Sequence, residues 1–585
     1  MLPSQIDSIG KETLRQSTNS FWTPALILFA LGLAMRLPFQ AQLVQSWDAG
    51  NFALAVEHYD VRLEQPHMPG TFIIFVFLAR FFNLFFKNPT ASLVMVNVLA
   101  SAIAAAMLYV IAATWFNPRA GKTAALLMLT SPLVWFYGEM PLSYMAEFCW
   151  VLLIVFAAYC TGLGKQKKPK DPGSRAQGIY TNADSPSLLP SQFSPLTNNQ
   201  KNLGVDGNEQ STINHQPPLG DKKALFALAL LMGLSGGIRP GTPFFLLPLS
   251  LLAVWRGLHN RQFNLKHVAA AVLVGLVGLA IWMIPLLIIS GGPQAYWQLV
   301  EGWIPVHTQR QDADTLLEVL DNLLFFLKTV LMGVGVAVFP ALWVLIGSGV
   351  RIIRNLRRDW RLQTVLLWIA PGMMFFLFVH MRRQGHSFTI MPAFILLSGL
   401  AVVWLCDRFA LALWANRLWR WCYRANRFSK QGNRAWVVLT IAIALINGTF
   451  FLFGPNLRTF TTISKFDAKY GERIEFVRAN FPPATTAIVA QKHYGRLPDV
   501  HLSEYQEPHL SRRVEDIPIV IAPQVRTLVL LDNKIFRQPG QDSGFQKLEM
   551  PSGKTIRYRS WSPDWQLKVT KYTSELVPVS SSESK

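Results

Sequence analysis

A carboxylate at a membrane border is the first candidate for chemistry. Asp48 follows Trp47 directly after the first apolar segment, within SWDAGNFALAVEHYDVRLEQPHMPGTFIIF, residues 46–75. Apolar residues recur at helical spacing from Phe52 to Tyr59, which predicts a short helix on the membrane surface with Trp47 as an interface anchor. Asp48 then lies near the N-terminus of this helix, where a carboxylate is favoured as a cap. From spacing alone, a functional carboxylate and a plain helix cap are both open.

A histidine and a proline lead into the next apolar segment, in Gln65–Gly70. Pro69 suits the first turn of a helix, so the outer end of this segment should present free N–H groups and a positive dipole. Such an end can hold a phosphate. His67 would add a hydrogen bond or a metal bond there, unless it is a solvated interface residue.

Two arginines are candidates for binding an anion. Arg310 is the single base in the acidic loop 291–322. Its planar guanidinium suits a phosphate, although an ion pair with Asp312 or Asp314 is the alternative. Arg239 lies where two short apolar segments meet, and an arginine near membrane depth is costly unless it is paired. Arg239 is therefore a functional candidate.

Other charged residues flank the apolar segments and are candidates for supporting roles. Glu139 and Glu147 border two such segments, and one of them could face the same cavity as Asp48. Arg382, Arg383 and His386 occupy a loop predicted to lie outside, where positive charge is unexpected. An anionic ligand would explain these bases, and so would lipid head groups.

Composition places all of these residues in a membrane protein. The chain has 585 residues, 51% of them hydrophobic and 15% charged, with a mean hydropathy of +0.26. A soluble chain of this length would carry more charge. The apolar residues run in blocks near the length that crosses a bilayer, which predicts an α-helical polytopic membrane protein with about 11–13 transmembrane helices. The candidate spans are about 21–37, 69–86, 92–116, 123–137, 143–163, 224–238, 241–255, 267–290, 323–349, 362–380, 388–405 and 436–453.

Loop charges predict the orientation. The net charge of +21 gathers on loops 256–266, 351–361 and 406–435, whereas loops 38–68 and 291–322 are acidic. Basic loops are typical of the cytoplasmic side, so the charge does not indicate nucleic acid. We expect a multi-pass protein of the plasma (inner) membrane with a cytoplasmic N-terminus and a periplasmic or extracellular C-terminal domain. One of the four apolar segments between residues 69 and 163 must be split, re-entrant or not a full span. Thr123–Tyr137 is the weakest of them, and the sequence leaves the choice open.

The predicted organisation has five parts. They are a cytoplasmic N-terminus (1–20), an N-terminal membrane module (21–164) with outer loop 38–68, a disordered cytoplasmic insert (165–223), a second membrane module (224–453) and a small outer α/β domain (454–585). The insert is rich in turn formers and poor in aromatic residues, so it cannot bury enough apolar surface to order itself. Within the last part we expect a helix at Ser464–Asn480 and strands at Thr486–Ala490, Ile517–Ile521, Thr527–Leu531, Thr555–Arg559 and Trp565–Val569.

Several common catalytic motifs are absent from the sequence. We find no P-loop, GxSxG, HExxH, zinc-type cysteine pairs or dinucleotide-binding glycine fingerprint. ATP-driven transport and serine hydrolysis therefore lose support.

The ordered set of motifs resembles the GT-C superfamily of polytopic glycosyltransferases. It is most similar to the family-39 type, which contains protein O-mannosyltransferases and lipid A aminoarabinose transferases. Asp48-Ala49, the following helix and His67–Phe72 are similar to the first outer loop of that branch, although Ala49 replaces a second acid and Pro69-Gly70 replaces a proline pair. His307–Arg310 resembles a later His-x-x-Arg-Phe segment. Ser387–Pro392 resembles an Arg-Tyr-Leu-Leu-Pro segment whose arginine Arg382 or Arg383 would have to supply.

This resemblance implies transfer of a sugar from a polyprenyl-phosphate donor to a lipid, glycan or protein acceptor on the outer face, with inversion. Asp48 would be the general base. Arg310, Arg239 and the helix end near His67 would bind the donor phosphate. His67 and His307 would hold a divalent metal if one is required, and membrane lipids would surround the spans.

Two other classes of function remain open from the sequence. A transporter or flippase of lipid-linked sugars would also need outer cations and charge within the membrane, but no internal repeat supports it. A scaffold or receptor would place its function in the outer tail.

Overall fold

The computed structural model describes residues 22–164, 221–308, 315–356, 359–379, 383–415, 428–455, 458–490, 495–506, 523–531, 544–561, 565–569 and 574–578. The predicted N-terminus (1–20) and residues 165–220 of the predicted insert (165–223) lie outside these ranges, whereas residues 221–223 begin a helix.

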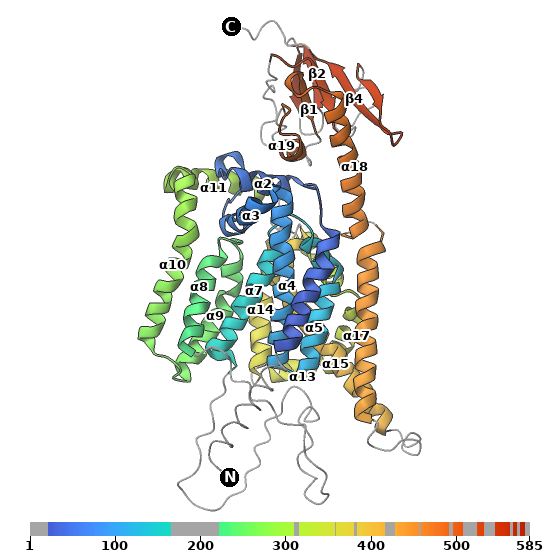
Figure 1. The fold of residues 1–585 in the computed structure, drawn as a ribbon. Coiled ribbons are helices and arrows are strands. Elements are labelled where there is room, and N and C mark those ends of the chain that lie inside the picture. The colour runs from blue at the N-terminus through green and yellow to red at the C-terminus, as the bar shows by residue number, and fades with distance from the viewer. Residues whose placement is uncertain are drawn as a thin grey trace, which may run out of the picture.

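The described residues form a bundle of apolar helices with a small domain at one end (Figure 1). Eight helical stretches in them are long and apolar enough to cross a membrane, so the chain is a multi-pass membrane protein. In chain order, the bundle consists of Trp22–Phe39, α4 (Pro89–Trp115), α5 (Pro118–Thr130) with α6 (Pro132–Gly138), α7 (Tyr144–Ala158), α8 (Asp221–Ser235), α9 (Thr242–His259), α10 (Leu265–Ile289), α12 (Leu316–Val334) with α13 (Val338–Asn355), α14 (Trp360–Phe378), α15 (Met391–Ala415) and α17 (Phe428–Phe453).

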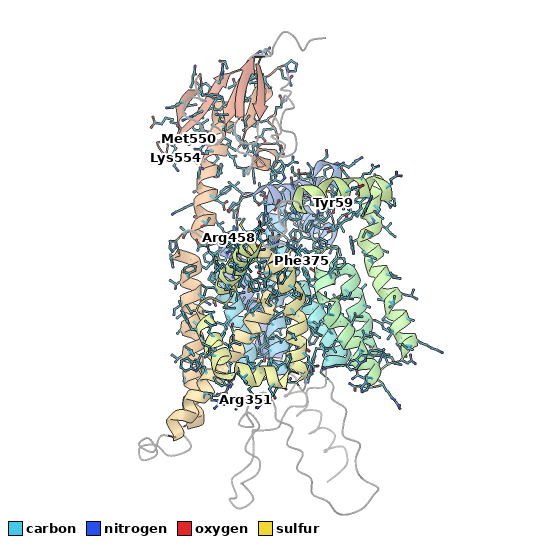
Figure 2. The ribbon with its side chains drawn as sticks, turned by 180° about the vertical axis from the view of Figure 1, so that it is seen from behind. Tyr59, Arg351, Phe375, Arg458, Met550 and Lys554 are labelled. Carbon is cyan, nitrogen blue, oxygen red and sulfur yellow. The ribbon has the colours of Figure 1, made fainter. Side chains whose placement is uncertain are left out.

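The two ends of the bundle can be distinguished by the elements that they carry. We call the end that carries α2 (Trp47–Glu57), α11 (Pro293–Thr308) and the C-terminal domain the tail end, and the opposite end the basic end (Figure 1). Figure 2 shows Tyr59 and Arg458 toward the tail end and Arg351 at the basic end. The assignment of the basic end to the cytoplasm stays a prediction from its loops.

The sequence left open which segment between residues 69 and 163 is not a full span, and in the structure it is 69–86. Thr123–Tyr137, the weakest segment in the sequence, is divided between two helices. Residues Ile73–Phe86 form α3, whose Arg80 donates hydrogen bonds to the carbonyl oxygens of Val56 (2.8 Å) and Ala55 (3.2 Å) in α2. These bonds hold α3 at the tail end. Its 14 residues would extend only about 21 Å, less than the apolar thickness of a bilayer.

Segment Thr123–Tyr137, in contrast, lies on two consecutive short helices, α5 and α6, which together run through the bundle (Figure 1). α5 and α6 meet at Ser131, whose hydroxyl donates to the carbonyl oxygen of Gly333 at 2.6 Å. A bundle partner thus satisfies a polar group at the break, as lipid could not. The central helices α4 and α7 are 72% and 83% buried over their apolar windows, whereas α10 is 17% buried. α10 therefore lies at the periphery, facing lipid.

The C-terminal domain begins with α18 (Phe460–Asn480), close to the helix predicted at Ser464–Asn480. Its sheet has the order β1-β2-β4-β3, with β1 and β2 parallel and the other pairs antiparallel. Strands β1 (Thr486–Val489), β2 (Thr527–Leu530), β4 (Thr555–Ser560) and β5 (Trp565–Val569) match predicted strands, and β5 pairs with β6 (Ser574–Pro578) in a separate sheet. The predicted strand Ile517–Ile521 lies outside the described residues.

Two of the strands, β3 (Gln546–Glu549) and β6, were not predicted. β3 reads Gln-Lys-Leu-Glu, lies at an edge of the sheet and has mostly exposed side chains. Edge strands need no alternating apolar face, so their sequences carry little strand signal.

The domain contacts the first outer loop through α18 and α19 (Arg496–His501). The Asp467 carboxylate accepts hydrogen bonds from the backbone N–H groups of Gln42 (2.9 Å) and Leu43 (3.3 Å) and from the Gln45 side chain (3.4 Å). His501 Nε2 accepts from the Val44 N–H at 3.2 Å. Burial lowers the pKa of His501 to about 4, which keeps the ring neutral and able to accept this bond.

Burial raises the pKa of Asp467 from 3.8 to about 6, although the three donors oppose the rise. Because the folded pKa is the higher one, ionisation of Asp467 costs stability as the pH rises through this window. Asp467→Asn has no such cost. The difference in Tm, variant minus wild type, should therefore increase by about 2 °C between about pH 4.5 and about pH 7 in detergent.

The matched control for this titration is Glu475→Gln, which changes an exposed carboxylate on the same helix. Its Tm difference from wild type should stay nearly constant over the same range of pH. A constant or decreasing difference for Asp467→Asn would contradict the raised pKa.

Candidate functional site

Asp48 lies in the first turn of α2 without serving as its cap. Ser46 is the N-cap residue, and its hydroxyl accepts a hydrogen bond from the N–H of Ala49 at 3.2 Å. The Asp48 carboxylate instead forms an ion pair with the guanidinium of Arg383. The interpretation of Asp48 as a plain helix cap is therefore wrong, and the carboxylate is available for another role.

Arg383 directly precedes η6 (Gln384–Thr389), a short 3-10 helix. Gly385 of this segment lies on the ring of Tyr144 so closely that a Cβ atom would come 2.6 Å from ring carbons. His386 is partly buried, with its ring 6.1 Å from the ring of Tyr144. The backbone at Gly385 is therefore pressed against an aromatic ring, two residues after Arg383.

Arg239 lies in a buried network that reaches the other end of η6. Its Nε is 3.3 Å from Oε2 of Glu147, and its guanidinium stacks over Tyr144 with 4.3 Å to the ring centre. Oε1 of Glu147 accepts hydrogen bonds from the hydroxyls of Thr242 (2.8 Å) and Thr389 (2.6 Å). Arg239 is thus paired, as an arginine at membrane depth must be.

Residues 383–389 therefore connect the two sites that the sequence singled out separately. Arg383 at the start of this stretch pairs with Asp48, and Thr389 at its end bonds Glu147, the partner of Arg239. Tyr144, which lies against both Gly385 and Arg239, ties the middle of the stretch to the same network. We call Asp48, Arg383, Tyr144, Glu147 and Arg239 the acid–arginine cluster.

A third arginine, Arg458, reaches the same stretch and was missed in the sequence. Its guanidinium lies 5.1 Å from the ring centre of Phe136 and 5.7 Å from that of Tyr137, and its Nε donates to Gln384 Oε1 at 3.2 Å. Figure 2 shows Arg458 in the tail half of the bundle, below the C-terminal domain. A lone arginine after the last span gives no sequence signal beyond ordinary loop charge.

His67 lies in an aromatic group, with its ring centre 5.1 Å from those of both Phe52 and Phe72. The helix expected to begin at Pro69 begins at Ile73, and the N–H of Ile74 is bonded to the carbonyl oxygen of Gly237. The helix end predicted to bind a phosphate therefore lies further along the chain, at Ile73, and one of its N–H groups is already hydrogen-bonded. A role for His67 toward donor or metal stays a prediction.

Glu139 belongs to a separate buried pair. Its Oε1 is 3.9 Å from Nε of Arg36, and both side chains are fully buried. Arg36 also donates to the carbonyl oxygen of Leu129 (3.0 Å) and lies over the ring of Trp135 (4.9 Å). These contacts join the first helix to α5 and α6, so Glu139 has a packing role in this arrangement.

Other candidates are not described. Arg310, Arg382 and the side chain of His307 lie outside the described residues. Among the residues that are described, no group of three or more His, Cys, Asp or Glu side chains could hold a metal ion. The pairing of His67 with His307 on a divalent metal accordingly stays a prediction.

Comparison with known proteins adds a sequence family and a fold. Residues 69–287 match the Alg9-like mannosyltransferase family. No curated protein matches the chain. The structure resembles ArnT from Cupriavidus metallidurans in the apo state, with a TM-score of 0.54 and 12% identity over 94% of this chain and 98% of that one.

The same enzyme bound to undecaprenyl phosphate gives a TM-score of 0.52 and 12% identity over 93% of this chain and 98% of the other. The Archaeoglobus fulgidus oligosaccharyltransferase in the apo form is a weaker match, with a TM-score of 0.45 and 11% identity over 92% and 74% of the two chains. The expected fold, a helical membrane bundle with a small C-terminal α/β domain, is confirmed.

Proposed function

We propose a specific reaction for this chain, which is a multi-pass membrane glycosyltransferase of the GT-C superfamily. The proposed reaction moves one sugar from a polyprenyl-phosphate donor to a hydroxyl of a lipid, glycan or protein acceptor. It takes place at the tail end, on the periplasmic or extracellular face of the plasma (inner) membrane. The anomeric carbon is inverted, and Asp48 is the general base.

The observation that carries this proposal is the pairing of Asp48 with Arg383 in the acid–arginine cluster. A carboxylate at this position can take the proton of the acceptor hydroxyl as its oxygen attacks C1 of the sugar. The bond from C1 to the phosphate oxygen then breaks, and polyprenyl phosphate leaves with the electron pair. Guanidinium groups beside the carboxylate suit the charge that grows on this phosphate.

The donor class rests on the fold and on the arginines. ArnT, whose fold this chain shares, has been crystallised with undecaprenyl phosphate. Arg239, Arg383 and Arg458 all contact residues 383–389 or their immediate partners, so three cations lie along this one stretch of chain. Arg310 is a fourth candidate in the neighbouring outer loop.

Arg383 has to exchange partners during this reaction. A carboxylate paired with a guanidinium is a weak base, because the cation favours its ionised form. A donor phosphate would compete for the same guanidinium through two parallel hydrogen bonds. Binding of the donor would thereby release Asp48 at the moment when a base is required.

This exchange predicts the behaviour of Arg383→Met. The variant loses a phosphate ligand, so the KM for the donor should rise by about 10-fold or more, a loss of at least about 1.4 kcal/mol. Arg383→Lys keeps the positive charge but loses the planar guanidinium that makes two parallel hydrogen bonds. The KM for the donor should therefore rise less than in Arg383→Met. Initial rates over a range of donor concentrations measure both effects. An unchanged donor KM in Arg383→Met would contradict the role.

The experiment that tests the function uses purified protein and a panel of polyprenyl-phosphate sugars. We expect one donor to yield free polyprenyl phosphate, and parallel samples with a chelator test the possible metal. A flippase would move the intact donor across a vesicle membrane and form no free polyprenyl phosphate. That outcome would replace the proposed transferase with the transport alternative.

A further inference from the structure

The C-terminal domain touches α2 beside Asp48. Helix α19 lies directly above α2 (Figure 1). The guanidinium of Arg496, the first residue of α19, lies over the indole of Trp47 with 4.6 Å to the ring centre. Trp47 is 6% exposed, so the sequence-based expectation that it anchors the loop in lipid head groups was wrong.

The two helices approach each other as closely as their atoms allow. A Cβ atom on Gly50 would lie 2.2 Å from the Cβ of Arg496, far inside contact distance. Glycine at position 50 therefore permits the domain to rest on α2. The contact spans both sides of the carboxylate, since Trp47 precedes Asp48 and Gly50 follows it by two residues.

Each member of the stack is held by further bonds. Arg496 donates from Nη1 to Asp499 Oδ2 (2.9 Å) and from Nη2 to the carbonyl oxygen of Leu63 (3.2 Å). The indole N–H of Trp47 donates to Glu64 Oε2 at 3.3 Å. Because both stacked side chains are held by further hydrogen bonds, a movement of α19 would also move Trp47 at the start of α2.

We infer that Arg496 is a positioning residue, through which the C-terminal domain holds α2 so that the Asp48 carboxylate meets the reacting hydroxyl. This inference rests on the proposed function of Asp48. It assigns the outer domain a direct part in the transfer step.

The expected cost of losing this contact is catalytic. Without the guanidinium, α2 can tilt or shift beneath α19, and a displacement of about 1 Å at a catalytic group can lower a rate by about 10²-fold. Arg239 and Arg458 contact residues outside α2 and keep these contacts, and Arg383, although it pairs with Asp48, lies outside α2 as well. The rate of the bound complex should therefore fall while donor affinity is preserved.

The first test is Arg496→Ala in the full-length protein. We expect kcat to fall by about 10-fold or more, with the donor KM changed by no more than about twofold. Deuterium uptake of residues 47–57 should increase. Arg496→Lys keeps a cation over the indole and should recover part of kcat. Arg526→Ala, at an exposed arginine of the same domain, is the matched control and should resemble wild type.

A second test separates packing from the guanidinium. Gly50→Ala alone places a methyl group against Arg496 and should displace the domain, lowering kcat. The double variant Gly50→Ala/Arg496→Gly removes the steric clash between positions 50 and 496, but it also removes the guanidinium. We expect Tm to recover toward wild type while kcat remains low. Recovery of kcat together with Tm would show that packing alone suffices and would overturn the inference.

The outcomes also distinguish this inference from the proposed function. If wild type turns over donor, Asp48→Asn does not, and Arg496→Ala matches wild type in kcat and in deuterium uptake, the positioning role fails and the general base stands. If no polyprenyl-phosphate sugar is turned over by wild type, the proposed function fails first. A fall in Arg496→Ala that comes only from a smaller folded fraction would also overturn the positioning role.

Discussion

Arg239→Met should destabilise the protein by about 3–5 kcal/mol, because it leaves the Glu147 carboxylate buried without a cation. Glu147 is 1% exposed, and its other oxygen is already bonded to Thr242 and Thr389. Water therefore cannot replace the guanidinium. We expect a large fall in Tm and in the yield of monodisperse protein from detergent.

A double variant separates this structural effect from donor binding. Glu147→Gln in the Arg239→Met background removes the unpaired charge but keeps an oxygen for both threonine hydroxyls, so folding should be restored. Transfer should remain at least about 10²-fold below wild type, because one of the cations proposed to bind the donor phosphate is still missing. Transfer that returned with folding would limit Arg239 to a structural role.

The control for this pair is Arg62→Met. Arg62 pairs with Asp60 on the first outer loop, but its side chain is 61% exposed. The Asp60 side chain is only 8% exposed, but its Oδ1 keeps the hydrogen bond from the backbone N–H of Arg62 at 2.9 Å. The variant therefore removes an exposed cation, which contributes little, without leaving the carboxylate bare. Tm and transfer should both remain close to wild type.

Asp48→Asn should fold like wild type and lose at least about 10²-fold in the rate of sugar transfer. Asparagine keeps the size of the side chain and an oxygen for the Arg383 guanidinium, while Ser46 still caps α2. The amide cannot accept the proton of a hydroxyl at neutral pH. Initial rates of product formation and thermal unfolding in the same detergent measure the two properties.

The matched control is Glu57→Gln, which changes an exposed carboxylate at the other end of the same helix. Its rate should lie within about twofold of wild type, since exposed surface substitutions have small effects. An equal loss in both variants would indicate a general dependence on loop charge and would remove the specific role of Asp48.

The sequence predicted the class of fold, and residue type and position singled out Asp48 as the candidate base, a role that stays a prediction. Long apolar blocks and alternating loop charge were sufficient for the membrane bundle. The exception was α3, an apolar helix with lipid-exposed residues such as Leu84 and Phe85 that stays at one end. Composition cannot distinguish such a helix from a short span, because both present apolar side chains to lipid.

The arrangement of the cluster was less predictable. Arg239 could be singled out because an arginine is costly within a membrane. Arg383 was one of several bases in its loop, and its pairing with Asp48 joins residues 335 positions apart. The aromatic rings over which Arg458 and Arg496 lie are distant in sequence, so no local pattern predicts these two contacts.

Donor binding and donor cleavage measured together in wild type and Asp48→Asn test the central claim most directly. Labelled polyprenyl-phosphate sugar is titrated onto each protein, and free polyprenyl phosphate is then followed in the same samples, with water as the hydroxyl that receives the sugar. We predict dissociation constants that agree within about threefold and a release rate at least about 10²-fold lower in the variant. Release at the wild-type rate from Asp48→Asn would contradict the assignment of Asp48 as the general base.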